Sequence, residues 1–147
     1  MNDDLRTKRA TFRALHEQGC FVLANPWDVG GIRRLEKLGF KALASTSAGA
    51  AWALGHNDGE LSLDEILEHL RLLCTATNLP VNADFEAGFA DEPEGVATNV
   101  ALALDTGVAG RSAEGLANVV ARQNAGLLAA LRSAPLGYDD SDEEAAA

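Results

Sequence analysis

Three oxygen-bearing side chains occur at every second position in the middle of the chain. Asn82, Asp84 and Glu86 directly follow the short apolar segment 79–81. Alternate side chains of a strand point to the same face, so this spacing predicts that all three lie together. Two carboxylates and a carboxamide suit a hard cation such as Mg²⁺, which prefers oxygen ligands. A solvated loop, in which Asp84 or Glu86 accepts hydrogen bonds from nearby backbone amides, is the alternative interpretation of the same residues.

A run of small residues follows the apolar segment 40–44. Its sequence is Ser45-Thr46-Ser47-Ala48-Gly49, and its hydroxyls and unobstructed backbone amides can approach an anion closely. Asp28, Asp58 and Glu114 also come after predicted strands. Polar groups after several strands favour a pocket at one end of a sheet.

Apolar segments of strand length alternate with helical patterns. Strands are predicted at 20–24, 40–44, 79–81 and 106–110. Helices are predicted over 3–17, from Asp28 to Gly39, as a short turn at 50–54, from Ser62 to Cys74, from Asp91 to Leu104, and over 113–132. The helix that starts at Ser62 carries a capping box with Glu65, and Leu61 and Ile66 are spaced as a hydrophobic staple.

The repeated order of strand and helix determines the predicted fold class. Connections this long join parallel strands by right-handed crossovers, and such sheets bind ligands at the carboxyl ends of their strands. The chain is therefore predicted to be α/β with a parallel sheet. A doubly wound sheet of four strands is compatible with the same pattern.

Composition narrows the class of protein. The 147 residues include 12 basic and 22 acidic side chains, a net charge of −10, which argues against nucleic acid or an anionic membrane as a partner. No apolar run approaches the roughly 20 residues of a membrane span, and the polar start is unlike a secretory signal, so a cytoplasmic protein is expected. We expect one domain over 1–132 and a disordered acidic tail over 133–147.

Several other side chains have simple expected environments. Cys20 and Cys74 lie in apolar surroundings and are predicted to be buried thiols. Trp52 is expected in the core, whereas Trp27 is compatible with either a pocket wall or packing at a rim. His69, within a predicted helix, is expected at the surface.

Taken in order, these motifs resemble the isocitrate lyase and phosphoenolpyruvate mutase superfamily, in particular its carboxyvinyl-carboxyphosphonate phosphorylmutase-like and methylisocitrate lyase-like branches. The resemblance covers about residues 8–114. Its motifs are Asn25-Pro26-Trp27-Asp28-Val29-Gly30, Thr46-Ser47-Ala48-Gly49, Leu54-Gly55 through Asp58-Gly59, and Pro80-Val81-Asn82-Ala83-Asp84-Phe85-Glu86 with Gly88-Phe89. The resemblance implies a (β/α)8 barrel of which this chain supplies about four βα units.

The resemblance also implies chemistry. Members cleave or form a C–C or P–C bond next to a 2-oxo carboxylate, and Mg²⁺ stabilises the enolate that develops. The implied metal residues are Asp84 and Glu86. The implied catalytic residues are Asp58, which reaches the metal through water, and Glu114. Thr46, Ser47, Ala48 and Asn82 are the implied substrate-binding residues.

The sequence also departs from the family pattern. After Glu114 the family has an acidic residue and a mobile catalytic loop, whereas here Gly115-Leu116-Ala117-Asn118 follows. No counterparts of strands five to eight follow, although such a barrel takes on the order of 250 residues. Two hypotheses result. The chain is a lyase or mutase that acts on a small 2-oxo acid or carboxylate as a homo-oligomer, or it is a truncated, inactive member that serves as a binding or interaction module.

Overall fold

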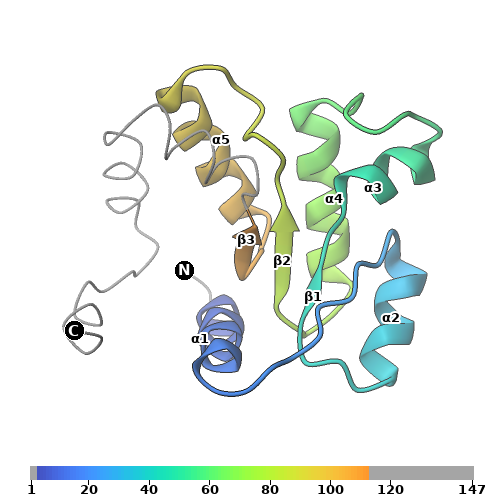
Figure 1. Cartoon of the computed structure of the whole chain (residues 1–147), viewed down its shortest axis with the longest axis vertical. Coiled ribbons are helices and arrows are strands. Elements are labelled where there is room, and N and C mark those ends of the chain that lie inside the picture. Colours follow the sequence, from blue (N-terminus) through green and yellow to red (C-terminus); the bar gives the residue numbers. More distant parts are fainter. Residues whose placement is uncertain (1–2, 113–147) are drawn as a thin grey trace.

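A parallel sheet of short strands lies at the centre of the structure. The computed structural model describes residues 3–112. Within that part of the chain the strands are β1 (Leu43–Ala44), β2 (Val81–Asp84) and β3 (Gly110–Ser112), in the spatial order β1-β2-β3. Both neighbouring pairs are parallel, and Figure 1 shows β2 between β1 and β3. The predicted mixed α/β fold with parallel strands is therefore confirmed.

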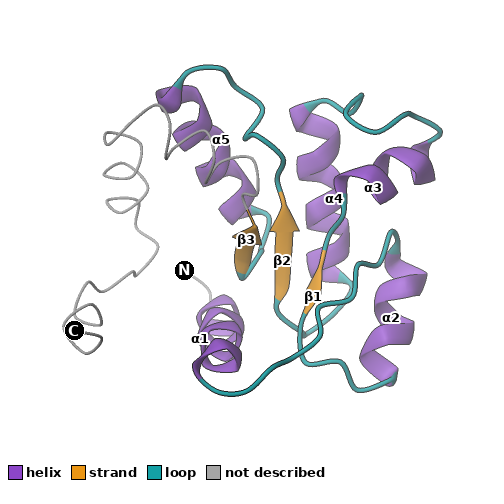
Figure 2. Ribbon diagram, viewed as in Figure 1, coloured by secondary structure: helices purple, strands orange, loops and turns teal. Residues whose placement is uncertain are grey.

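Five helices surround this sheet within the described residues. They are α1 (Asp3–Glu17), α2 (Val29–Lys37), α3 (Ser47–Leu54), α4 (Leu63–Thr75) and α5 (Pro93–Asp105). Helices α4 and α5 contact each other, and both α2 and α3 pack against α4 (Figure 2). Val81, Ala83 and Phe85 contribute to one apolar cluster together with side chains of α4 and α5. Since side chains alternate along β2, Asn82 and Asp84 lie on the opposite face of the strand.

Local side-chain contacts fix the starts of two helices. At α4, the Ser62 N–H donates to Glu65 Oε2 at 2.8 Å and the Glu65 N–H donates back to Ser62 Oγ, which completes the predicted capping box. The pKa of Glu65 is lowered, first by the hydrogen bond that the Ser62 hydroxyl donates to its carboxylate and then by the bond from the Ser62 N–H. At α2, Asp28 Oδ1 accepts from the Gly31 N–H at 2.6 Å. Asp28 thus serves as an N-cap.

The prediction of a strand at 20–24 is wrong for most of that segment. In segment 20–24 a parallel bridge joins Ala24 to Leu43, and the residues before Ala24 form no ladder. Val22 is 69% exposed and Cys20 is exposed, which contradicts the predicted buried strand and the predicted buried thiol. Among the described residues this segment has one sheet neighbour, β1, and its Phe21 packs edge-to-face against Phe12 and His16 of α1.

The other strand boundaries shift because turns take up the flanking residues. The predicted strand 106–110 is largely the turn after α5, where Thr106 is the C-cap and Gly107 has a φ of 101°. The strand itself begins at Gly110. The segment 40–44 is a strand only at β1. The predicted helix 113–132 and the tail 133–147 lie outside the described residues.

Two basic side chains of α1 reach the carboxyl ends of other helices. Lys8 Nζ donates to the carbonyl oxygen of Thr77, just after α4, at 2.9 Å. Arg9 Nη2 donates to the carbonyl oxygen of Leu104, in the last turn of α5, at 3.4 Å. Cations are favourable at helix carboxyl ends, so these contacts attach α1 to both helices. None of the described helices has the length and apolar character of a membrane span.

Candidate functional site

The candidate site lies at the carboxyl ends of β1 and β2. Ser45 joins the two strands beyond their last paired residues: its N–H donates to the carbonyl oxygen of Asn82 at 2.8 Å, and its hydroxyl accepts from the Asp84 N–H at 2.8 Å. Its carbonyl oxygen accepts from Asn25 Nδ2 at 2.9 Å. Ser45 is 2% exposed, so these bonds form a buried support directly below Asp84.

Asp84 and the start of α3 are in direct contact. The Ser47 N–H donates to Asp84 Oδ2 at 2.9 Å, and the Ser47 hydroxyl donates to the same oxygen at 3.0 Å. Neither contact uses Oδ1 of the carboxylate. The alternative interpretation from the sequence was an acidic side chain that accepts hydrogen bonds from nearby backbone amides. It is partly correct for Asp84, although the amide is that of Ser47, in the segment after β1.

The predicted small-residue run forms the N-terminus of α3. Thr46 is the N-cap, and its Oγ1 accepts from the Gly49 N–H at 3.2 Å. The prediction placed a helical turn only at 50–54, whereas α3 already begins at Ser47. Ala48 occupies the second helical position, whose N–H has no partner within a helix. Together with the helix dipole, this arrangement favours an anion beside Thr46, Ser47 and Ala48.

Asn82 and Glu86 have different surroundings, although the sequence predicted one face for both. Asn82 is 7% exposed in β2, and its Oδ1 lies so near Gly110 that a Cβ added there would be 3.0 Å away. Glu86 lies beyond the strand with a φ of 44°, in the left-handed region. The regular alternation therefore holds for Asn82 and Asp84 and stops before Glu86.

Glu86 is the ionisable group of this site whose charge is most clearly disfavoured. Its pKa is raised, first by burial and then by the negative charges of Asp84 and Asp58. These three predicted residues therefore lie close enough to interact electrostatically. A bound cation would relieve this repulsion, since an opposite charge stabilises ionised carboxylates.

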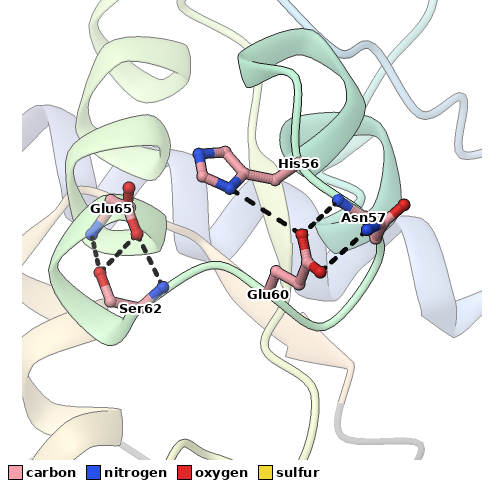
Figure 3. Close-up of polar contacts among 5 residues, drawn as sticks. All are labelled: His56, Asn57, Glu60, Ser62 and Glu65. Atoms are coloured by element: carbon pink, nitrogen blue, oxygen red, sulfur yellow. Dashed lines mark hydrogen bonds and ion pairs between the residues drawn. The ribbon is translucent and has the colours of Figure 1, made fainter.

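Asp58 lies in an ordered turn between α3 and α4. Asn57 and Glu60 close the turn: the Asn57 N–H and Nδ2 donate to the two oxygens of Glu60, each at 2.8 Å (Figure 3). The ring of His56 lies 4.0 Å from Glu60. Asp58 itself is exposed, which leaves its carboxylate accessible to solvent or to a ligand.

The loop after β2 has a support that the sequence did not reveal. Asn99 of α5 donates from Nδ2 to the carbonyl oxygens of Gly88 and Phe89 at 2.9 and 3.0 Å. Phe89 has a φ of 57°, so the loop contains two non-glycine residues in the left-handed region. A polar asparagine near the apolar residues Val96 and Val100 of α5 was the available signal.

The donor set is compatible with Mg²⁺ but not with a cage made only of protein ligands. Among residues 3–112 no group of three or more His, Cys, Asp or Glu side chains is close enough to hold a metal ion. Mg²⁺ commonly binds through one or two carboxylates together with water and ligand oxygens. Asp84, supported by Ser47, fits that requirement. Glu114 lies outside the described residues, so its predicted role is not tested.

Comparison with known proteins identifies similar chains. The profile of the family named phosphoenolpyruvate phosphomutase matches residues 12–134. An uncharacterized protein of Mycobacterium tuberculosis is 34% identical over 99 residues, which are 67% of this chain and 38% of that protein.

Solved structures are similar over a comparable share of the chain. A Burkholderia cenocepacia protein, provisionally named a lyase/mutase, is 44% identical with a TM-score of 0.74, over 76% of this chain and 40% of that one. Oxaloacetate acetylhydrolase in complex with its product oxalate is 28% identical with a TM-score of 0.64, over 71% of this chain and 38% of that one. This chain therefore spans less than half the length of these relatives.

Proposed function

The chain belongs to the phosphoenolpyruvate phosphomutase family, and from that membership we propose that its site binds Mg²⁺ together with a small 2-oxo carboxylate. In the complete site the reaction is the cleavage or formation of a C–C or P–C bond through an enolate. The observation that carries the proposal is the Asp84 carboxylate, held by Ser47 at the carboxyl end of β2 within the electrostatic reach of Glu86 and Asp58.

Asp84 is the residue proposed to hold the cation, with Glu86 and Asp58 as outer acidic groups. Mg²⁺ would supply positive charge beside oxygens that become negative as the bond alpha to the carbonyl breaks. Ser47 orients the carboxylate of Asp84. The N-terminus of α3 would receive the substrate carboxylate or phosphonate through the Ala48 N–H and the Thr46–Ser47 turn. Asn82, buried in β2, is proposed to contact the substrate from the face that also carries Asp84.

The expectation of a homo-oligomer is part of the proposal. Segment 20–24 pairs with β1 through Ala24 alone, and Val22 is largely exposed. A second copy that covered this edge would complete backbone hydrogen bonds and bury apolar surface. Size-exclusion chromatography with light scattering tests this point, and a monomer at micromolar concentration would reject it.

Binding of Mg²⁺ and oxalate tests the site itself. Oxalate is the appropriate probe because it resembles an enolate product and binds to the structurally similar acetylhydrolase. Isothermal titration calorimetry of the full chain should detect Mg²⁺ and then Mg²⁺-dependent oxalate binding, and Asp84→Ala should abolish both. Asp64→Ala, which removes an exposed acid in the first turn of α4, is the matched control. Equal binding by the parent and Asp84→Ala would reject the proposal.

Turnover is the separate question raised by the second hypothesis, an inactive binding module. The family relationship favours a lyase or mutase, and the inactive module is the alternative that activity assays test. Assays with 2-methylisocitrate, isocitrate and oxaloacetate, each with and without Mg²⁺, distinguish them. Turnover that Asp84→Ala abolishes would exclude the module hypothesis.

A further inference from the structure

The two tryptophans of this chain form an exposed pair beside the candidate site. Trp27 lies in the loop before α2, and Trp52 lies in α3. Their ring centroids are 5.5 Å apart with an edge-to-face geometry of 68°. The exposed fractions are 47% for Trp27 and 55% for Trp52, so the prediction of a core position for Trp52 is wrong.

The ring of Trp27 lies against the first turn of α3. A Cβ added to Gly49 would be 2.5 Å from Trp27 Cδ1 and 2.7 Å from its Nε1. On the other side it would be 2.6 Å from the methyl group of Thr46. Gly49 is therefore enclosed between the indole and the N-cap residue, and the absence of a side chain allows this close approach.

The loop that carries Trp27 is held by hydrogen bonds before and after this residue in the sequence. Before it, Asn25 donates to the carbonyl oxygen of Ser45 at 2.9 Å. After it, Asp28 caps α2 through the Gly31 N–H. Pro26, between these anchors, is buried. The indole is thus held by fixed backbone on one side and rests on the helix turn that contains Ser47.

We infer that Trp27 is a positioning residue, which holds the first turn of α3 so that the two donors of Ser47 meet Asp84. The inference rests on the proposed function of this site as far as ligand binding is concerned. The positioning itself does not depend on a ligand. Without the indole, Gly49 keeps its contact with Thr46 but loses its contact with Trp27, and the first turn of α3 can move away from β2. Trp52 touches the same ring but is not among the nearest neighbours of Gly49.

The first measurement needs no ligand. Amide hydrogen exchange of the ¹⁵N-labelled full chain reports on the Ser47 N–H, which is bonded to Asp84 in the parent. Trp27→Ala should increase the Ser47 exchange rate about tenfold or more, since each tenfold step needs only about 1.4 kcal/mol of lost protection. Trp27→Phe, which retains a ring, should restore most of the protection. Trp52→Ala should leave Ser47 within about twofold of the parent after correction for global stability.

The second measurement tests whether the contact of Trp27 with α3 affects ligand binding. With Mg²⁺ present, oxalate affinity should fall about 10- to 100-fold in Trp27→Ala, the usual range for a residue that supports a metal site, and recover in Trp27→Phe. A parent chain that binds neither Mg²⁺ nor oxalate would reject the proposed function and leave the Ser47 exchange result as the test of Trp27. Unchanged Ser47 protection in Trp27→Ala, or equal loss in Trp52→Ala, would overturn the positioning role.

Discussion

Ser47 donates both its backbone N–H and its hydroxyl to one oxygen of Asp84, at 2.9 and 3.0 Å. The two residues are separated by 37 positions in the sequence and belong to the start of α3 and the end of β2. The contact therefore joins the anion-favouring helix terminus to the carboxylate proposed for Mg²⁺. A movement of the first turn of α3 should therefore shift the Asp84 carboxylate, and a movement of that carboxylate should shift the turn.

Ser47→Ala should weaken Mg²⁺ binding while Ser47→Thr largely retains it. Alanine keeps the N–H contact to Asp84 but removes the hydroxyl donor, and the loss of such a supporting bond typically weakens metal binding about 10- to 100-fold. Calorimetric titration measures the difference. Ser62→Ala is the control, because it should lower stability by about 1 kcal/mol through loss of the α4 cap without changing Mg²⁺ affinity.

Glu86 should make both stability and Mg²⁺ binding depend on pH. Its pKa is raised by burial and by Asp84 and Asp58, so the folded protein holds this proton more tightly than the unfolded chain does. As pH rises from the ordinary glutamate range through the raised pKa, folding stability should fall without Mg²⁺. Mg²⁺ should remove this loss, because it binds more tightly once Glu86 is ionised.

Side-chain carboxyl NMR of Glu86 provides the direct measurement for that expectation. Asp58→Asn removes one of the two negative charges that raise this pKa and should shift the Glu86 titration toward its ordinary pKa. Glu94→Gln, on α5 and exposed, should not shift it. A Glu86 titration that is identical in the parent and Asp58→Asn would show that Asp58 does not raise this pKa, and would leave burial and Asp84 as its causes.

Sequence periodicity predicted those features that depend on neighbouring residues. It placed Asn82 and Asp84 on one face of β2, and it found the Ser62–Glu65 cap because both partners lie within one helical turn. It could not predict the left-handed Glu86, nor Asn99 holding the loop after β2, since both depend on contacts between separate elements. The prediction of a strand at 20–24 was wrong for a related reason: an apolar composition does not determine whether a segment pairs with a neighbouring strand.

His69 should make the folded state more stable as pH rises. The sequence suggested a surface histidine, but within residues 3–112 its Nε2 is buried without a hydrogen-bond partner. Burial lowers the pKa of His69, and Asp28 partly opposes this shift. The unfolded chain therefore binds the proton more readily. Stability should increase between the lowered folded pKa and the ordinary value of about 6.5, and should not increase further above it.

Urea denaturation of His69→Gln across that pH interval isolates this contribution. The variant should lack the part of the slope that His69 supplies, whereas His16→Gln, at an exposed position of α1, should retain it. Asp28→Asn should lower the pKa of His69 further, because it removes a negative charge that raises this pKa. The same slope in the parent and His69→Gln would assign the pH dependence to other groups.

Lys8→Ala should destabilise the fold by about 1.5 to 3 kcal/mol, the range for a hydrogen bond that involves a charged group. Lys8 is 9% exposed and donates to the carbonyl oxygen of Thr77, which is 5% exposed as a residue. Its ion pair with Asp4 at 3.6 Å is solvent-exposed on the acid's side and should contribute little. Chemical denaturation measures the loss, with Arg6→Ala at an exposed position as control.

Gly88→Ala should destabilise the loop after β2 more than Gly59→Ala destabilises its own turn. Both glycines have left-handed φ angles, 86° and 79°, so an alanine at either position is strained by roughly 1 kcal/mol. A Cβ at Gly59 meets nothing within 4 Å, whereas at Gly88 it would lie 2.6 Å from Val96 Cγ1. The difference between the two variants therefore measures the collision with α5.

A double-mutant cycle with Val96→Ala separates this collision from the backbone strain. Removing the Val96 methyl groups makes room for the new Cβ, so the double variant should be more stable than the sum of the single changes predicts. The same collision should displace the carbonyl oxygens of Gly88 and Phe89 from Asn99 and weaken Mg²⁺ binding through Glu86. Additive stabilities would instead show that Val96 moves aside freely, and that backbone strain accounts for the whole effect of Gly88→Ala.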